Sequence, residues 1–208
     1  MTKSIQDDHF VTPIAAYKSS TGITIAYELM AVSLLEVAIC GDFEEPELVI
    51  ILKQVVDGLK YLEQRGIGHP KLSCSSVLMN TSGQVKIGDQ HFCREGGTDN
   101  LITGFYKVLE TLLTGHENGN FKENMQSTRW GDPQLYEFFD TVERFKSEMT
   151  SDLTTRAKLE KIAQHPFLKL GQEQLPTADF ALPILWRFRW LTKDVDAISE
   201  ELSDRTLC

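Results

Sequence analysis

The sequence predicts a mainly helical fold with a small antiparallel β component, of the α+β class. Residues 44–65 carry leucine and valine side chains at alternating steps of three and four, which places them on one face of a long helix. Three later segments, 101–113, 133–146 and 155–163, show the same spacing. Near the start, residues 22–30 are rich in β-branched and aromatic side chains, which favours a strand.

The first predicted elements are two strands and a short helix. Residues 22–30 (GITIAYELM) follow the turn-like run 19–22 (SSTG), and residues 11–17 supply the partner strand. A short helix then begins at Ser33, whose hydroxyl can accept orphan amide protons, and runs to Ile39. We expect it to stop at Gly41, because glycine tolerates a left-handed exit.

The long helix has clear signals at both ends. Glu44, Glu45 and Glu47 lie in its first turn, where carboxylates favour the helix dipole. Pro46 has no amide proton to lose there, and Gly66 marks the end. After it, residues 76–80 and 84–87 are predicted to form a small hairpin around the turn 81–83.

Length and charge restrict the class of protein. A chain of 208 residues with 41% hydrophobic content can bury one main core. Its formal net charge of -9 repels phosphate backbones and anionic lipids, so we expect no nucleic-acid or membrane partner. Four cysteines lie far apart without zinc-ligand spacing, which favours reduced thiols and no histidine or cysteine metal site: Cys40, Cys74, Cys93 and Cys208.

Localisation is predicted from two absences in the sequence. Residues 1–10 are polar and lack the layout of a secretory signal. The longest apolar stretch, residues 48–56, contains Lys53 and Gln54 and is shorter than the roughly 20 residues that a membrane span needs. We therefore expect a cytoplasmic protein.

The order of the motifs resembles the carboxy-terminal half of eukaryotic protein kinases. That family has a buried helix, then a loop His-Arg-Asp-Leu-Lys-x-x-Asn, then a hairpin and an Asp-Phe-Gly site. The corresponding stretches here are residues 69–78 (HPKLSCSSVL) and 85–91 (VKIGDQH). Residues 27–30 (YELM) resemble the hinge, residues 9–13 the segment before it, and Arg156 with residues 165–168 (HPFL) the end of the lobe.

The residues that carry phosphoryl transfer in the family differ in this chain. By the resemblance, Lys71 occupies the position of the proton-accepting aspartate and Ser76 that of the metal-binding asparagine. An ammonium ion has no lone pair with which to take a proton. The glycine-rich loop and the phosphate-binding lysine are not found. No catalytic residue is therefore predicted.

The resemblance leaves Met30 at the hinge, Leu78 on the pocket floor and Asp89 as candidate nucleotide-binding residues, with Asp89 also the candidate metal ligand. The competing interpretation makes Asp89 a turn residue whose oxygens accept backbone amide protons. His69 is expected to pack and hydrogen-bond beneath the loop, as in the family. No cofactor is expected, and weak binding of ATP with Mg²⁺ is the alternative.

Three regions and a function follow from these interpretations. Residues 1–45 are predicted to be a remnant of the amino-terminal lobe with hinge and first helix, 46–170 the kinase-like carboxy-terminal lobe, and 171–208 an aromatic-rich tail. The expected function is that of a pseudokinase, a non-enzymatic binding or scaffold module for protein partners of unknown identity. The alternatives are a divergent or fragmentary kinase with residual ATP and Mg²⁺ binding and phosphotransfer, and a truncated gene product.

The tail contains a dense apolar run with two tryptophans and two arginines, residues 181–190 (ALPILWRFRW). Tryptophan and arginine are enriched at binding hot spots. The other interpretation is that the run folds back on the lobe, which would bury Trp186 and Trp190 while the arginines reach solvent.

Overall fold

The computed structural model describes residues 5–40, 43–117, 119–122, 130–148 and 153–170. The helices are α1 (Leu34–Cys40), α2 (Glu45–Gln64), α3 (Asn100–Thr114), α4 (Pro133–Ser147), α5 (Thr155–Ala163) and α6 (Pro166–Lys169). The strands are β1 (Pro13–Lys18), β2 (Ile23–Tyr27), β3 (Val32–Ser33), β4 (Ile67–Gly68), β5 (Val77–Met79), β6 (Val85–Ile87) and β7 (Arg94–Glu95). The predicted tail and the predicted stop at Gly41 lie outside the described residues, and the division at residues 45 and 170 stays a prediction.

Helix α2 is the centre of the helical body, and the sequence predicted it within one residue at each end. The five residues that set its spacing are all 0% exposed: Leu48, Leu52, Val55, Leu59 and Leu62. At its start, the amide of Glu44 donates to the Glu47 carboxylate at 2.9 Å, one half of a reciprocal capping box. At its end, Gly66 has φ 68°, the left-handed conformation expected there.

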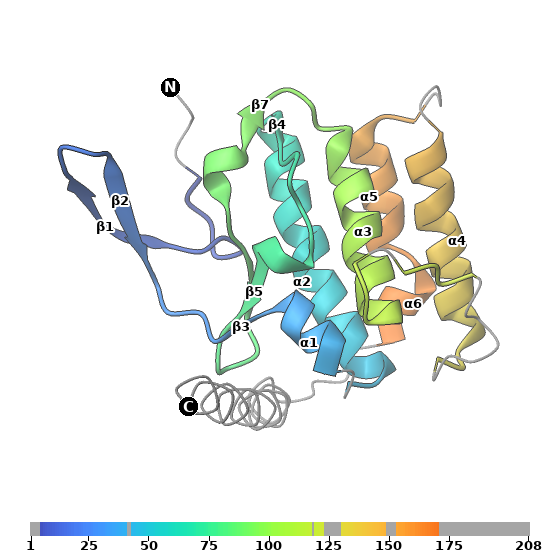
Figure 1. Cartoon of the computed structure of the whole chain (residues 1–208). Helices are drawn as coiled ribbons and strands as arrows, with labels where there is room; N and C mark the ends of the chain where they lie inside the picture. The colour runs from blue at the N-terminus through green and yellow to red at the C-terminus, as the bar shows by residue number, and fades with distance from the viewer. Residues whose placement is uncertain (1–4, 41–42, 118, 123–129, 149–152, 171–208) are drawn as a thin grey trace, which may run out of the picture.

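Aromatic side chains join helices α3, α4 and α6 of the body. Phe138 of α4 lies 6.3 Å from Phe105 of α3 and 5.3 Å from Phe167 of α6, measured between ring centroids. Figure 1 shows α2, α3, α5 and α4 as neighbouring helices. The predicted helices 101–113, 133–146 and 155–163 are confirmed as α3, α4 and α5, because each buries the face that its spacing defines.

The hairpin of β1 and β2 projects away from this body (Figure 1). Both predicted strands exist, but β2 ends at Tyr27, so Met30 lies beyond it. Ile23, Ile25 and Tyr27 occupy alternate positions of β2, so their side chains lie on one face of the hairpin. These three side chains are 70%, 43% and 38% exposed. The hairpin face is therefore apolar and open to solvent.

A second sheet connects the hairpin to the body. Its order is β3-β5-β6, and β5 with β6 is the predicted small hairpin. Phe10 forms a parallel bridge with Ile87, so the segment before β1 lies along β6. The amide of Ile87 donates to the His9 carbonyl at 2.8 Å, and the Val11 amide donates to the Ile87 carbonyl at 3.1 Å.

Two features between Asp89 and α3 were not predicted. Residues Gln90–Phe92 form a 3-10 turn, η2, and β7 pairs with β4 in a two-stranded sheet. Both strands of that sheet have two residues and lie beside glycines, so no apolar period marks them. In the described ranges, no helix has both the length and the apolar character needed to cross a membrane.

Candidate functional site

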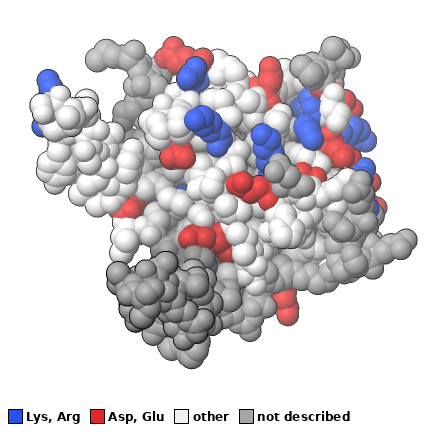
Figure 2. Space-filling model, in the orientation of Figure 1, with Lys and Arg blue, Asp and Glu red and all other residues white. Residues whose placement is uncertain are grey.

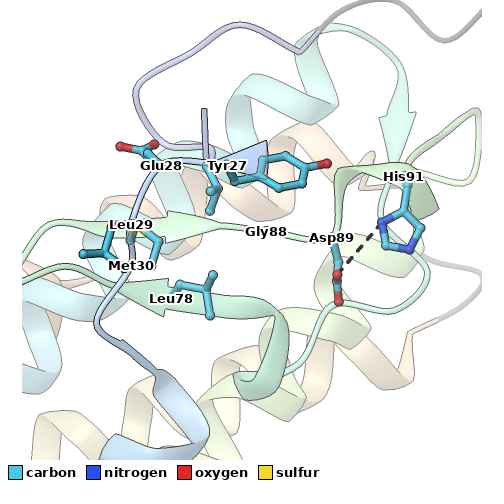
Figure 3. A pocket seen from close by; sticks show the side chains of 9 residues that line it. Tyr27, Glu28, Leu29, Met30, Leu78, Gly88, Asp89 and His91 are labelled. Carbon is cyan, nitrogen blue, oxygen red and sulfur yellow. Dashed lines mark ion pairs between the residues drawn. The ribbon is translucent and has the colours of Figure 1, made fainter. Parts of the chain in front are cut away.

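A cavity of about 480 Å³ lies where the hairpin meets the body. Figure 3 shows the segment Tyr27–Met30 on one side, Leu78 of β5 below, and Asp89 with His91 across from them. The cavity is lined by Val11, Tyr27, Glu28, Leu29, Met30, Leu78, Gly88, Asp89 and His91. The fold thus brings the three sequence-predicted binding residues, Met30, Leu78 and Asp89, to one place.

The hinge side of the cavity is held by Glu28. Its Oε1 accepts the Lys86 ammonium and the Thr12 amide, each at 2.7 Å. Partial burial acts to raise the pKa of Glu28, but the hydrogen bonds from Lys86 and Thr12 outweigh it and hold that pKa below its ordinary value of 4.5. Glu28 is therefore a carboxylate at neutral pH.

Asp89 lies on the opposite side, directly after β6. Its φ of 52° is the only positive value at a non-glycine position among the described residues. Such backbone conformations concentrate at functional sites, although aspartate adopts them more readily than most residues. The Asp89 side chain caps no amide of η2, which does not support the turn interpretation. Its Oδ1 lies 4.0 Å from His91 Nδ1, and both side chains are exposed.

The loop before η1 (Cys74–Ser76) is fixed against Gly88, the residue that precedes Asp89. His69 is 0% exposed, and its Nε2 donates to the Gly88 carbonyl at 3.1 Å. Burial lowers the pKa of His69 below its ordinary value of 6.5, against the opposing effect of that hydrogen bond. The Gly88 amide donates to the Ser76 carbonyl at 2.8 Å. The expected packing role of His69 is what the structure shows.

Lys71 and Ser76 lie outside the lining of this cavity. The Lys71 ammonium lies 3.8 Å from the centroid of the Phe92 ring, a cation–π contact, and the residue is exposed. The Ser76 hydroxyl is occupied within its own turn, where it accepts the Ser73 amide and donates to the Ser73 carbonyl, both at 3.0 Å. In this conformation Ser76 does not offer its oxygen to a ligand.

Arg156, which by the resemblance lies at the end of the lobe, bonds within its own helix. Its Nε donates to Glu160 Oε1 at 3.3 Å, and both side chains are exposed. Sequence reasoning also missed the pair of Glu28 and Lys86, which lie 58 positions apart. A signal was present, because Lys86 is a charged residue in a strand that otherwise reads as buried.

Comparison with known proteins places the chain among the protein kinases. The family model described as protein tyrosine and serine/threonine kinase matches residues 1–105, half of the chain. Cyclin-dependent kinase 12 of Caenorhabditis elegans is 31% identical over 94 residues, 42% of this chain and 13% of that protein. Its Drosophila melanogaster counterpart is 31% identical over 106 residues, 46% of this chain and 9% of that protein. Cyclin-dependent kinase G1 of Arabidopsis thaliana is 37% identical over 81 residues, 36% of this chain and 13% of that protein.

These matches correct one expectation from the sequence. We expected a protein that is not an enzyme, but the relatives are named as kinases, which points to an enzyme. The error came from giving single positions such as Lys71 more weight than the similarity around them. The chain spans about a tenth of the length of these three relatives.

Proposed function

This chain belongs to the protein tyrosine and serine/threonine kinase family, and on that premise we propose that it is a divergent protein kinase that binds ATP with Mg²⁺ between Met30 and Asp89. The observation that carries the proposal is the shared cavity of Met30, Leu78 and Asp89. Met30 comes from the hinge segment after β2, Leu78 from β5 and Asp89 from the segment after β6. Only the fold brings them together.

The cavity suits a nucleotide in size and in character. Ligand sites of 300–1,000 Å³ with apolar walls and a few polar groups are typical of small-molecule binding, and this cavity of about 480 Å³ falls in that range. Leu29, Met30, Val11 and Leu78 supply apolar walls for a flat base. Asp89 supplies the polar end. Because Leu29 and Met30 lie at the hinge and Asp89 lies across from them, we place the base at the hinge and the phosphates toward Asp89.

A resident metal ion does not fit the side chains alone. No group of three or more His, Cys, Asp or Glu side chains converges on one point in the described part of the chain. Mg²⁺ prefers several oxygen ligands and is commonly held by one or two carboxylates together with substrate phosphates. Asp89, the carboxylate across the cavity from the hinge, matches that pattern. When bound, the ion would supply charge neutralisation on the phosphates.

The residue at the proton-acceptor position lowers the expected rate without removing the reaction. Phosphoryl transfer depends mainly on positioning and charge neutralisation. A general base adds a factor of about 10²–10⁴, which Lys71 cannot supply because its ammonium has no lone pair. We expect transfer that is slower by about this factor than in a kinase with an aspartate there.

The test combines binding and transfer. Calorimetry with ATP and Mg²⁺ should show saturable binding by wild type and a clear loss in Asp89→Asn. Asp57→Asn is the matched control, because Asp57 is an exposed aspartate on α2 that pairs with Lys60. Radiolabel transfer from ATP to a generic protein substrate should likewise be lost in Asp89→Asn and kept in wild type and Asp57→Asn.

Two results would contradict the proposal. One is the absence of ATP binding by wild type at millimolar concentration. The other is equal binding by wild type and Asp89→Asn, which would place the nucleotide elsewhere.

A protein-binding function is a second candidate, favoured by the hairpin face of Ile23, Ile25 and Tyr27. The hairpin contains one charged residue, Lys18, and Figure 2 shows little charge over it while both signs cover the body. Exposed apolar patches of this kind commonly mark interaction sites. Sedimentation of wild type beside Ile23→Ser tests whether copies of the chain associate through this face, and identical monomeric behaviour would count against that form of binding.

A further inference from the structure

Lys86 is a buried cation whose two neighbours, Leu78 by strand pairing and Glu28 by its side chain, line the cavity. It is 6% exposed and belongs to β6, between Val85 and Ile87, which are also buried. Lysine is almost never this buried unless it has a partner. The partner is Glu28, whose Oε1 accepts the ammonium at 2.7 Å. Lys86 does not line the cavity, so any effect on a ligand has to act through Glu28.

Glu28 joins three parts of the chain. The Oε1 atom that accepts from Lys86 also accepts the Thr12 amide at 2.7 Å. In return, the Glu28 amide donates to the Thr12 carbonyl at 2.9 Å. The hinge, the base of β1 and strand β6 therefore meet at one carboxylate.

Leu29 and Met30 have fewer attachments of their own. Leu29 is 92% exposed, and both residues line the cavity. The next anchoring hydrogen bond along the chain comes from the Ala31 amide, which donates to the Met79 carbonyl at 2.8 Å. The path of the hinge is thus set by its two ends, Glu28 and Ala31.

We propose that Lys86 is a positioning residue of the nucleotide site, which holds Glu28 and thereby fixes the hinge opposite Asp89. This inference rests on the proposed function. A direct role in phosphate binding does not fit the contacts, because the ammonium is turned toward Glu28 and is buried. The effect of Lys86 should therefore fall on the base-binding end of the cavity.

The experiment compares ATP with adenosine, which lacks phosphates, by calorimetry. Lys86→Met keeps the bulk of the side chain and removes its charge, and it should weaken both ligands by the same factor, about tenfold or more. Glu28→Gln keeps an acceptor oxygen for Thr12 and Lys86, so a smaller loss of about threefold is expected for both ligands. Asp89→Asn should weaken ATP with Mg²⁺ and leave adenosine unchanged.

The matched control is Lys60→Met, since Lys60 forms a more exposed pair with Asp57 at 3.8 Å on α2. It should leave both affinities unchanged. Hydrogen exchange of the Thr12 amide, measured without any ligand, should be faster in Lys86→Met and unchanged in Lys60→Met.

Each outcome decides the proposal. Equal affinities of wild type and Lys86→Met overturn it while the proposed function stands. A loss for ATP alone also overturns it, because Lys86 would then act on the phosphates. If wild type binds neither ligand, the proposed function fails and this inference fails with it. If Lys86→Met does not fold, Glu28→Gln decides, and an unchanged affinity for adenosine in that variant overturns the proposal.

Discussion

The hairpin of β1 and β2 and the helical body are held by different forces. In the body, Leu48, Leu52 and Phe138 are 0% exposed and contact other buried side chains. In the hairpin, Ile14 and Ile23 are 70% exposed, and the contacts that hold it are polar and lie at its base. An isolated two-stranded hairpin is marginally stable in water. The body therefore supplies the stability, and the hairpin depends on its anchors.

The largest expected effect is a difference in unfolding free energy between two aromatic truncations, one in the body and one in the hairpin. Phe138→Ala removes a fully buried ring that contacts Phe105 and Phe167, and it should cost about 3–5 kcal/mol of unfolding free energy. Tyr17→Ala in the hairpin, where the side chain is 63% exposed, should change that free energy by at most about 0.5 kcal/mol. Urea denaturation measures both. Similar losses would show that the hairpin is part of the cooperative core.

A smaller effect tests whether tight packing extends to the loop that carries Lys71. A Cβ at Gly104 of α3 would lie 2.6 Å from Leu72 Cβ, so Gly104→Ala should cost about 1–3 kcal/mol. At Gly131 a Cβ would meet nothing within 4 Å, and Gly131→Ala should stay within about 0.5 kcal/mol. Thermal unfolding compares the two. A neutral Gly104→Ala would mean that the loop moves aside easily.

Acid should destabilise the body before it releases the hairpin. Burial lowers the pKa of His69 in the folded protein, so the unfolded chain binds the proton first as pH falls through 6.5. The stability contributed by neutral His69 is complete above that value and declines below it. His165 has the same direction of shift, also because of burial. Denaturant midpoints between pH 7.5 and 5.5 should fall in wild type and fall less steeply in His69→Gln.

Release of the hairpin should follow at lower pH. The pKa of Glu28 is depressed in the folded state, so its contribution is complete above 4.5 and is lost as pH falls through the folded value. Hydrogen exchange at Thr12, corrected for the intrinsic pH dependence, should report the loss. In Glu28→Gln, exchange at Thr12 should not accelerate over this pH range. If it does, the acceleration belongs to another carboxylate, such as Asp7.

The smallest expected effect concerns the open face of the hairpin. Ile23→Ser should leave the unfolding free energy within about 0.5 kcal/mol, because the side chain is largely solvated already. Binding of an apolar dye should fall, since the exposed patch shrinks. A marked loss of stability would show that Ile23 is covered in solution.

The features that the sequence predicted are those with a local signal. Helix α2 has an apolar period, a capping pattern and a terminal glycine, and all of these act within a few residues. The hairpin has its turn residues between β-branched runs. Strands β4 and β7 have no such signal, because two residues are too few to show a period. The Glu28–Lys86 pair depends on a chain path that brings residues 58 positions apart together.

Three lining residues of the candidate cavity were named from the sequence, whereas the expectation of a non-enzyme was wrong. Met30, Leu78 and Asp89 were placed by motif order, and the fold gathers them in one cavity. The other lining residues, such as Val11 in the first predicted strand and His91 in the stretch 85–91, lie in segments that the sequence singled out, but they were not named as binding residues. The expectation of a non-enzyme rested on Lys71, on Ser76, and on the missing glycine-rich loop and phosphate-binding lysine. Lys71 and Ser76 do not line that cavity.

The anchors of the hairpin also impose an order on biosynthesis. Gln90 donates to the Val11 carbonyl at 2.7 Å across 79 positions of the chain. At about 5–20 residues per second, the ribosome needs about 4–16 s to make the intervening stretch. During that time the strands β1 and β2 have been made but lack the residues that hold their base. A nascent chain paused before residue 86 should therefore be a preferred client of chaperones that recognise exposed β-strands.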